Sequence, residues 1–324
     1  MAIKNNMLPL TQVTILVPLY NEVTVLPQLF DRLLQLSTSI NIPIHYLLVD
    51  DGSTDETGTY ISNFILDKSD WSALFLSRNF GHSAAITAGL SAIKKENGAV
   101  FIIDGDLQDP PELLPLFIQN MQQGNDVVYG IRNKRKESTL KKICYNVYYR
   151  LLKKFSSIQM PLDAGDFCLI SNRVVQQLNS MPEESRYLRG MRSWVGFKQQ
   201  GIPYERAARL SGKSKYPITT LFKLAFNGLF NFSELPIRII GIVGILAIIP
   251  SLIYLLITLY KKIIFGTVPE GFTALIFAIV LFSGVQLLSL GIIGEYVLRI
   301  FFQVKQRPLF IVKSKIIKGQ LVDE

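Results

Sequence analysis

Short apolar runs alternate with longer amphipathic segments up to about residue 130. The apolar runs end at Pro, Gly or Asp, which is typical of buried strands. Between them, apolar residues recur at helical spacing, which is typical of helices with one buried face. Strands are expected at residues 13–17, 44–49, 73–76, 100–103, 126–129 and 167–170, and helices at 26–34, 54–66, 82–93 and 113–121. This alternation predicts an α/β domain with a mostly parallel sheet and helices on both faces.

The pattern changes after residue 138. Residues 140–155 and 218–232 each place apolar side chains on one helical face and carry basic residues. The first of these helices suits a solvated core helix and a membrane surface about equally, whereas the second is expected to lie in a membrane interface. Ile239–Tyr260 and Gly271–Gly294 contain no charged residue, and each exceeds the roughly 20 residues needed to cross a bilayer. They predict a two-helix transmembrane hairpin.

Basic residues lie on the outer flanks of the two predicted spans and are sparse in the loop between them. The excess of Lys and Arg places both termini on the cytoplasmic side of a cell membrane. Four segments follow: a cytoplasmic α/β domain at 1–216, a juxtamembrane amphipathic helix at 217–235, the transmembrane hairpin at 236–298, and a basic cytoplasmic tail at 299–324. Glycines within both spans suit close helix packing, either within the hairpin or in a homo-oligomer.

The overall composition is basic and apolar, with a net charge of +9, a pI of about 9.4 and a mean hydropathy of +0.28. Such a chain is expected to have an anionic partner, namely nucleic acid, a membrane surface or a phosphorylated substrate. Cys144 and Cys168 are the two cysteines, too few for a disulfide framework or a metal site built on thiolates. Neither GxGxxG nor GxxxxGK[ST] occurs, so the two common phosphate-binding loops are absent.

Three carboxylates follow the strand expected at 100–103, at Asp104, Asp106 and Asp109. Carboxylates at the C-terminal end of a buried strand lie where open α/β sheets bind ligands. Asp104 and Asp106 point the same way if the segment is extended, and two hard oxygen donors suit Mg²⁺ or Mn²⁺ bound to a diphosphate. By itself, the pair suits a solvated acidic turn as well.

Two further polar clusters follow predicted strands, Tyr20-Asn21-Glu22 and Asp50-Asp51. If the three strands are neighbours in one parallel sheet, all three clusters converge on one edge. The convergence of three clusters is far more specific than any one of them.

Four longer motifs contain these clusters: VPLYNE (17–22), DDGSTD (50–55), NFGHSAAITAGL (79–90) and DGDLQDPPE (104–112). In these motifs the chain resembles family 2 glycosyltransferases with the GT-A fold. It looks most similar to the polyisoprenyl-phosphate glycosyltransferases, which include dolichol-phosphate mannose synthases and bactoprenol glucosyltransferases. DAGDFCLISNRVV (163–175), RGMRSWVGFKQ (189–199) and GKSKYP (212–217) extend the match, and two C-terminal spans favour the bactoprenol branch.

The resemblance implies roles for the matched residues on the donor side. Asp51 would accept a hydrogen bond from the N3–H of uracil, and Asp106 with Gln108 would bind Mg²⁺ or Mn²⁺. Asp109 is expected to cap the helix that starts at Pro110, and Asp50 to brace its turn. The residues expected to hold the nucleotide sugar are Pro18, Tyr20, Glu22, Val49, Asp51, Asp104 and Gly105.

The implied acceptor is a lipid phosphate, which is already anionic and needs cations more than a strong base. Arg132, Arg209 and Lys215 are the residues expected to bind it, with attraction to anionic lipid as the alternative for each. Asp166 is expected where related folds often keep an acidic base. The catalytic set is thus Asp104, Asp106, Asp166 and Arg132.

Four other polar or aromatic residues of these motifs have weaker assignments. Asp163 suits either substrate orientation or turn bracing, and His82 is expected to begin a helix. Tyr187 and Trp194 are expected to pack, with the sugar pocket as the alternative.

The predicted activity is inverting transfer of a hexose, with UDP-glucose as the favoured donor, to polyprenyl phosphate at the cytoplasmic face of the membrane. Its partners are the UDP-sugar, the lipid and the bilayer, and nucleic acid is not among them. A processive polysaccharide synthase is the first alternative, but such enzymes usually carry QxxRW and more spans, and here residues 189–194 read RGMRSW. The second is a non-catalytic membrane scaffold that keeps a nucleotide-binding fold.

Overall fold

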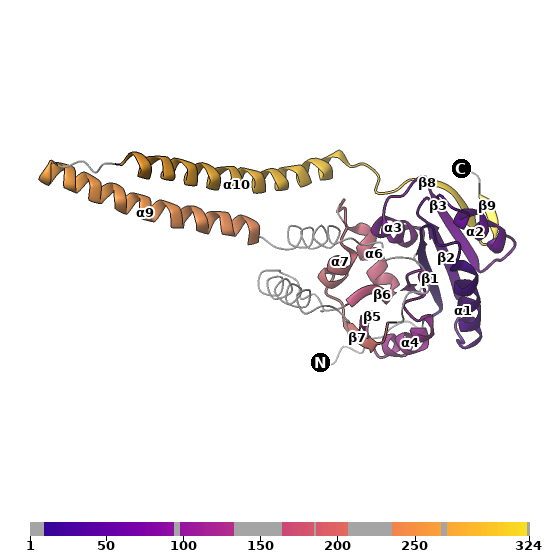
Figure 1. The fold of residues 1–324 in the computed structure, drawn as a ribbon. Helices are drawn as coiled ribbons and strands as arrows, with labels where there is room; N and C mark the ends of the chain where they lie inside the picture. Colours follow the sequence, from indigo (N-terminus) through magenta and orange to yellow (C-terminus); the bar gives the residue numbers. More distant parts are fainter. Residues whose placement is uncertain are drawn as a thin grey trace. The chain divides into compact units, whose positions relative to one another are not determined.

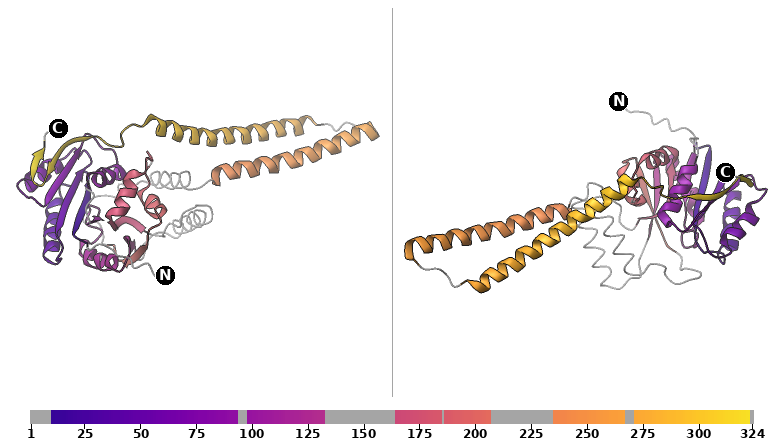
Figure 2. Two further views of the ribbon diagram at one scale, coloured as in Figure 1. Left: turned by 180° about the vertical axis from the view of Figure 1, so that it is seen from behind. Right: turned by 90° about the horizontal axis from the view of Figure 1, so that it is seen from above.

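A computed structural model describes residues 10–93, 98–132, 164–184, 186–206, 235–266 and 271–322. Two compact units make up the chain. The first contains the described residues up to 206 together with 308–322, and the second contains those from 235 to 307. The first unit is a sheet with helices packed on it, and the second is a pair of long helices (Figures 1 and 2).

The sheet of the first unit has nine strands in the order β7-β5-β6-β4-β1-β2-β3-β8-β9. Their bounds are β1 (Gln12–Leu19), β2 (Ile44–Asp50), β3 (Trp71–Leu76), β4 (Gly98–Ile102), β5 (Val127–Arg132), β6 (Ala164–Ser171), β7 (Gln199–Tyr204), β8 (Val312–Ile317) and β9 (Gln320–Val322). All six strands predicted from the apolar runs are confirmed, with ends that differ by a few residues.

The helices of this unit are α1 (Leu26–Thr38), α2 (Thr57–Ile65), α3 (His82–Ala92), η1 (Pro111–Leu113), α4 (Leu114–Gln122), α6 (Asn172–Ser180) and α7 (Leu188–Trp194). The four helices predicted between the first strands correspond to α1, α2, α3 and α4. The amphipathic helices predicted at 140–155 and 218–232 lie outside the described residues.

The sheet is mixed, which corrects the prediction of a mostly parallel sheet. The central strands β4, β1, β2 and β3 are parallel, but β6 runs antiparallel to both β4 and β5, and β8 runs antiparallel to β3. The alternation of strands and helices predicted only the central part correctly, because β6 and β8 enter the sheet from segments outside that alternation.

Both faces of the central strands are covered, which explains their continuous apolar sequence. On one face Ile15 and Val17 join a core with α1, α2 and α4, in which Tyr46 stacks on Trp71 at a centroid distance of 4.1 Å. On the other face α3 packs so closely that a Cβ on Gly89 would lie 2.2 Å from a methyl group of Leu16. The two faces of the central strands are therefore buried, and ligands can approach only at the ends of these strands.

The C-terminal residues return to this sheet, so the prediction of a simple basic tail at 299–324 missed two strands. β8 pairs with β3 and brings Ile316 into the core at 1% exposure. The turn before β9 is fixed by two backbone hydrogen bonds, from Asp67 N–H to the Gly319 carbonyl at 3.0 Å and from Gly319 N–H to the Trp71 carbonyl at 2.9 Å. Two lysines and a serine among its six residues obscured β8 in the sequence.

Replacing Ile316 with Ala is expected to lower the free energy of unfolding of the sheet unit by about 2–4 kcal/mol, because it leaves a cavity in a packed core. The matched control is Ile317→Ala, since Ile317 is 45% exposed and its loss should cost less than about 1 kcal/mol. Urea titration followed by tryptophan fluorescence measures both, because Trp71 lies in the same core. Equal effects of the two variants would contradict the placement of β8.

The second unit consists of α9 (Leu235–Phe265) and α10 (Phe272–Lys305), drawn in orange and yellow in Figure 1. Both predicted spans are helical, apart from the first residue of the second, Gly271, which is the N-cap of α10. Within the described residues, one stretch is long and apolar enough to cross a bilayer, Leu281–Lys305 in α10. The span predicted over α9 stays a prediction.

Candidate active site

The C-terminal ends of β4, β1 and β2 are adjacent, as the polar clusters of the sequence required. β1 pairs in parallel with both β2 and β4, so Glu22, Asp51 and Asp104 all follow strands that end at the same edge of the sheet. β5 and β7 end at this edge too, because two antiparallel pairings separate β4 from β5. The candidate site is therefore built from five strand ends.

Asp51 anchors one side of the site. Its buried carboxylate accepts hydrogen bonds from the backbone N–H groups of Phe80 and Gly81, at 2.8 and 2.9 Å. Burial raises the pKa of Asp51, and the two backbone donors partly offset the rise. Each oxygen can accept a second hydrogen bond, so the carboxylate can hold the loop before α3 and still receive a ligand donor.

Hydrogen bonds between loops fix the neighbouring residues. Asn21, which has a φ of 52°, donates its backbone N–H to Ser53 Oγ at 2.9 Å and accepts one from the Thr54 N–H at 2.8 Å. Glu22 N–H donates to Thr57 Oγ1 at 3.0 Å. The Asp50 carboxylate accepts hydrogen bonds from the hydroxyl and the N–H of Ser53, which confirms its turn-bracing role.

The other residues predicted to hold a nucleotide differ in accessibility. Tyr20 and Glu22 are half-buried at the loop after β1, where a ligand can reach them. Pro18 and Gly105 are buried, and Val49 is fully buried inside β2. The side chain of Val49 can therefore support the site only from beneath.

The carboxylates of Asp104 and Asp106 converge on one cation, the guanidinium of Arg206. Arg206 Nη2 lies 3.6 Å from Asp104 Oδ2 and 4.0 Å from Asp106 Oδ2, and Arg206 Nε donates to Asp109 Oδ1 at 3.0 Å. The two aspartates thus face one group, but residues 105 and 106 form a turn and not the extended segment on which the prediction depended. Arg206 was missed in the sequence, although it lies two residues after the end of β7, and Arg132 is the last residue of β5.

Asp109 does not cap a helix, which corrects the prediction. It is fully buried, and the cap position of η1 is Pro110, without a side-chain cap hydrogen bond. Its carboxylate instead accepts hydrogen bonds from the Tyr204 hydroxyl and Arg206, and Arg132 Nη2 lies 3.9 Å from Asp109 Oδ2. A buried carboxylate requires such partners, and here they tie the acidic segment to β5 and β7.

Arg132 lies in the site, with 15% of its side chain exposed. Its Nε donates to the Tyr204 hydroxyl at 3.3 Å, and its guanidinium occupies the space that a Cβ on Gly165 would enter, 2.9 Å from Nη2. Arg209 and Lys215, the other two cations expected to bind phosphate, lie outside the described residues, as does Asp163.

Asp166 lies in the site as predicted, on β6, but its contacts make it a weak base. Arg189 donates to both of its oxygens, at 3.1 and 2.9 Å, and His82 Nε2 lies 3.5 Å from Oδ2. Burial favours the neutral carboxyl, but Arg189 and His82 outweigh it and hold the pKa of Asp166 well below its usual range. Such a carboxylate positions its neighbours better than it removes a proton.

His82 is the first residue of α3, as predicted, and it also lies between two carboxylates of the site. Its Nε2 is 3.5 Å from Asp104 Oδ1 and 3.5 Å from Asp166 Oδ2. Burial by itself would lower the pKa of His82, but Asp166 and Asp104 outweigh it and raise the pKa to about 9. Burial and the neighbouring carboxylates raise the pKa of Asp104, and His82 opposes that rise.

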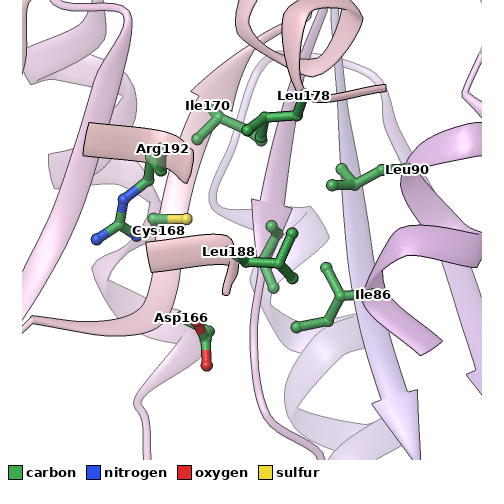
Figure 3. Close-up of a pocket in the computed structure, with 9 residues that line it drawn as sticks. Ile86, Leu90, Asp166, Cys168, Ile170, Leu178, Leu188 and Arg192 are labelled. Atoms are coloured by element: carbon green, nitrogen blue, oxygen red, sulfur yellow. The ribbon is translucent and has the colours of Figure 1, made fainter. Parts of the chain in front are cut away.

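A small cavity is lined by Asp166 and by other residues of β4, β6, α3, α6 and α7 (Figure 3). It is lined mainly by apolar side chains and has a volume of about 20 Å³, enough for one water molecule. Cys168 lies on its wall and is a buried core residue, as expected from the sequence. A cavity of this size excludes any ligand larger than a water molecule.

Trp194 and Tyr187 flank α7. Trp194 is 62% exposed, which rules out the core packing expected for it, and Tyr187 is half-buried.

Residues 14–178 match the model of glycosyl transferase family 2. The chain belongs to this family. It is 39% identical over 304 residues to an uncharacterized glycosyltransferase of Bacillus subtilis, YkcC, with 94% of each chain covered. It is 32% identical over 304 residues to the SfII prophage-derived bactoprenol glucosyl transferase of Shigella flexneri, with 94% of this chain and 98% of the relative covered.

Among solved structures, the chain is similar to the glucosyl-3-phosphoglycerate synthase of Mycobacterium tuberculosis in complex with Mn²⁺, UDP-glucose and phosphoglyceric acid. The matched region covers 68% of this chain and 79% of the synthase chain. The two are 14% identical, with a TM-score of 0.45. The family match, together with the sheet described above, makes the chain a glycosyltransferase with a GT-A α/β domain.

The acidic segment of this glycosyltransferase fits a divalent cation. The described residues contain no group of three His, Cys, Asp or Glu side chains that could hold a metal alone. However, Oδ2 of Asp104 and Oδ2 of Asp106 face the same cationic nitrogen, Arg206 Nη2, at 3.6 and 4.0 Å, so a divalent cation can take its place there. Two carboxylates fit Mg²⁺ or Mn²⁺ when diphosphate and water supply the remaining ligands. Gln108, half-buried, donates its backbone N–H to Asp106 at 3.2 Å.

Replacing Arg206 with Gln is expected to tighten Mn²⁺ binding about fivefold when no donor is present. The variant loses a positive charge about 4 Å from both carboxylates, worth about 1 kcal/mol even at the dielectric constant of water. The electron paramagnetic resonance signal of free Mn²⁺ measures the change.

Arg173→Gln is the matched control, because Arg173 forms an ion pair with Asp126 before β5, at the opposite edge of the sheet. It should leave Mn²⁺ binding unchanged. Weaker Mn²⁺ binding by the Arg206 variant would show instead that Arg206 helps to organise the carboxylates.

Proposed function

We propose that this glycosyltransferase transfers glucose from UDP-glucose to undecaprenyl phosphate, with inversion at the anomeric carbon. The observation that carries the proposal is the full-length similarity to bactoprenol glucosyl transferases, at 32% identity over 94% of the chain. The chemistry of the site supports it independently on both the donor side and the acceptor side.

On the donor side, the nucleoside binds near Asp51, Tyr20 and Glu22, above the buried Pro18, Val49 and Gly105. Asp104 lies next to them and receives the ribose or the sugar, while Asp106 and Gln108 hold Mg²⁺ or Mn²⁺. A bound divalent cation neutralises charge on the departing diphosphate. Support comes from the adjacent strand ends and from the convergence of Asp104 and Asp106 on one cation.

On the acceptor side, a lipid phosphate oxygen attacks the anomeric carbon opposite the departing UDP, so an α-linked donor gives a β-linked lipid sugar. The phosphate is an anionic nucleophile and requires no strong base. The low pKa of Asp166, caused by Arg189 and His82, agrees with such a reaction. Arg132 places the phosphate through its guanidinium, and Arg209 and Lys215 are proposed to assist it.

The proposal places the catalytic unit at the cytoplasmic face of the cell membrane, with α9 and α10 as two spans and both termini in the cytoplasm. Support comes from the uncharged stretches 239–260 and 271–294, which α9 and α10 contain almost entirely, and from the basic residues that flank them. A membrane anchor brings the site within reach of a lipid whose phosphate lies at the bilayer surface.

The test offers the purified full-length protein a panel of UDP- and GDP-sugars with undecaprenyl phosphate and Mn²⁺, and identifies the lipid product by mass spectrometry. A single hexose on the lipid from UDP-glucose is expected. A product from another donor would correct the sugar, and a polymer would favour a processive synthase. Absence of nucleotide release from every donor would favour a non-catalytic scaffold.

A further inference from the structure

Four side chains, alternately a nitrogen group and a carboxylate, form a row through the site. Arg189 of α7 holds Asp166 of β6 through two hydrogen bonds, His82 of α3 follows at 3.5 Å from Asp166, and Asp104 lies 3.5 Å beyond His82 Nε2. Each member comes from a different element. The row therefore links the position of Asp104 at the end of β4 to three other parts of the fold.

The loop before α3 fixes the place of His82 in this row. Gly81 adopts a φ of +101°, a conformation that favours glycine, and forms the N-cap of α3. The N–H groups of Phe80 and Gly81 are both bound by the Asp51 carboxylate. His82 therefore follows directly after two residues that Asp51, on the nucleoside side of the site, holds in place.

The two carboxylates that face His82 differ in how well they are satisfied. Asp166 receives two hydrogen bonds from Arg189. Asp104 Oδ1 is buried and receives no hydrogen bond from the described residues, although His82 Nε2 is nearby. A buried carboxylate oxygen of this kind is costly unless a donor reaches it. A sugar hydroxyl is such a donor, and it would donate a hydrogen bond to Asp104 Oδ1, the oxygen that faces His82.

We propose that His82 is a positioning residue that directs the Asp104 carboxylate at the sugar of the nucleotide-sugar donor. Without the imidazole, Asp104 and Asp166 lose the Nε2 group that lies 3.5 Å from each of them, and Asp104 can turn away from Asp166. The nucleotide half of the site keeps its contacts, because Asp51 binds the backbone of Phe80 and Gly81 and not the His82 side chain. The inference rests on the proposed function for the identity of the donor, and it does not depend on the acceptor.

The test measures the binding of UDP and of UDP-glucose by calorimetry, with Mn²⁺ and without any acceptor lipid. His82→Ala is expected to leave the affinity for UDP within about twofold and to weaken UDP-glucose about tenfold, the effect of one lost hydrogen bond to a charged group. His82→Gln should recover much of the loss, because its side-chain N–H can still reach a carboxylate. His45→Ala is the matched control, since His45 is the other histidine and lies at the opposite end of β2.

Two outcomes overturn the proposal. Equal weakening of UDP and UDP-glucose in His82→Ala would assign His82 to the structure of the loop before α3. Unchanged binding of both ligands would remove it from the site. If the proposed donor is wrong, the wild-type protein itself will not bind UDP-glucose. If the proposed acceptor is wrong, these measurements do not change, because they contain no acceptor lipid.

Discussion

Replacing Asp106 with Asn is expected to lower the rate of sugar transfer about 1,000-fold or more. The substitution keeps the size of a side chain that is only 11% exposed, so the fold should persist. It removes one of two carboxylates that face a common cation, and with it several kcal/mol of charge stabilisation on the leaving group. The measurement is UDP release across a Mn²⁺ titration, with UDP-glucose and undecaprenyl phosphate as substrates.

The control for this experiment is Asp31→Asn, which makes the same chemical change on the exposed surface of α1. That variant should match the wild type at every Mn²⁺ concentration. If Asp106→Asn kept full activity with a native thermal transition, metal-dependent transfer at this segment would be refuted.

Replacing Asp109 with Asn is expected to lower the free energy of unfolding of the sheet unit by about 3 kcal/mol. Asp109 is fully buried and is the shared partner of Arg206, Tyr204 and, at 3.9 Å, Arg132. Removing the negative charge takes the buried partner from two half-buried guanidinium groups, and breaking a buried ion pair typically costs about 3–5 kcal/mol. The lower end applies here, because Arg206 still faces Asp104 and Asp106. Chemical denaturation of the purified protein measures the loss.

This substitution separates two roles for Asp109. Asn caps helices about as well as Asp, so a capping role predicts almost no effect of Asp109→Asn. Tyr204→Phe is the graded control, because it removes one hydrogen bond to the same carboxylate and should cost about 1 kcal/mol. A neutral Asp109→Asn variant would restore the capping interpretation.

The central strands and the convergence of the polar clusters were predictable from the sequence. Buried parallel strands are continuously apolar, so their ends are marked sharply by Asn21, Asp50 and Asp104. The role of Asp50 in bracing its turn was predictable for a different reason: its partner, Ser53, is only three residues away in the sequence. Interactions of this range are encoded in local sequence.

The strand order β7-β5-β6-β4 decided most of the charge pairing in the site. Arg206 reaches Asp109 across 97 residues, because β7 pairs in parallel with β5 and the strands β4, β5 and β7 all end at one edge. Arg189 reaches Asp166 through the packing of α7 against β6. The sequence assigned Asp109 to a cap and Asp166 to a base because neither partner lies nearby in the chain.

The sequence by itself determined the fold class, the family and the edge of the sheet at which ligands bind, because hydrophobic periodicity and motif spacing record how each segment is buried. Only the tertiary structure decided that the sheet is mixed, that residues 312–322 complete it, and that His82 and Arg206 belong to the site. The physical reason is that an electrostatic interaction depends on distance in space. The periodic pattern of one segment contains no information about which distant segment will lie beside it.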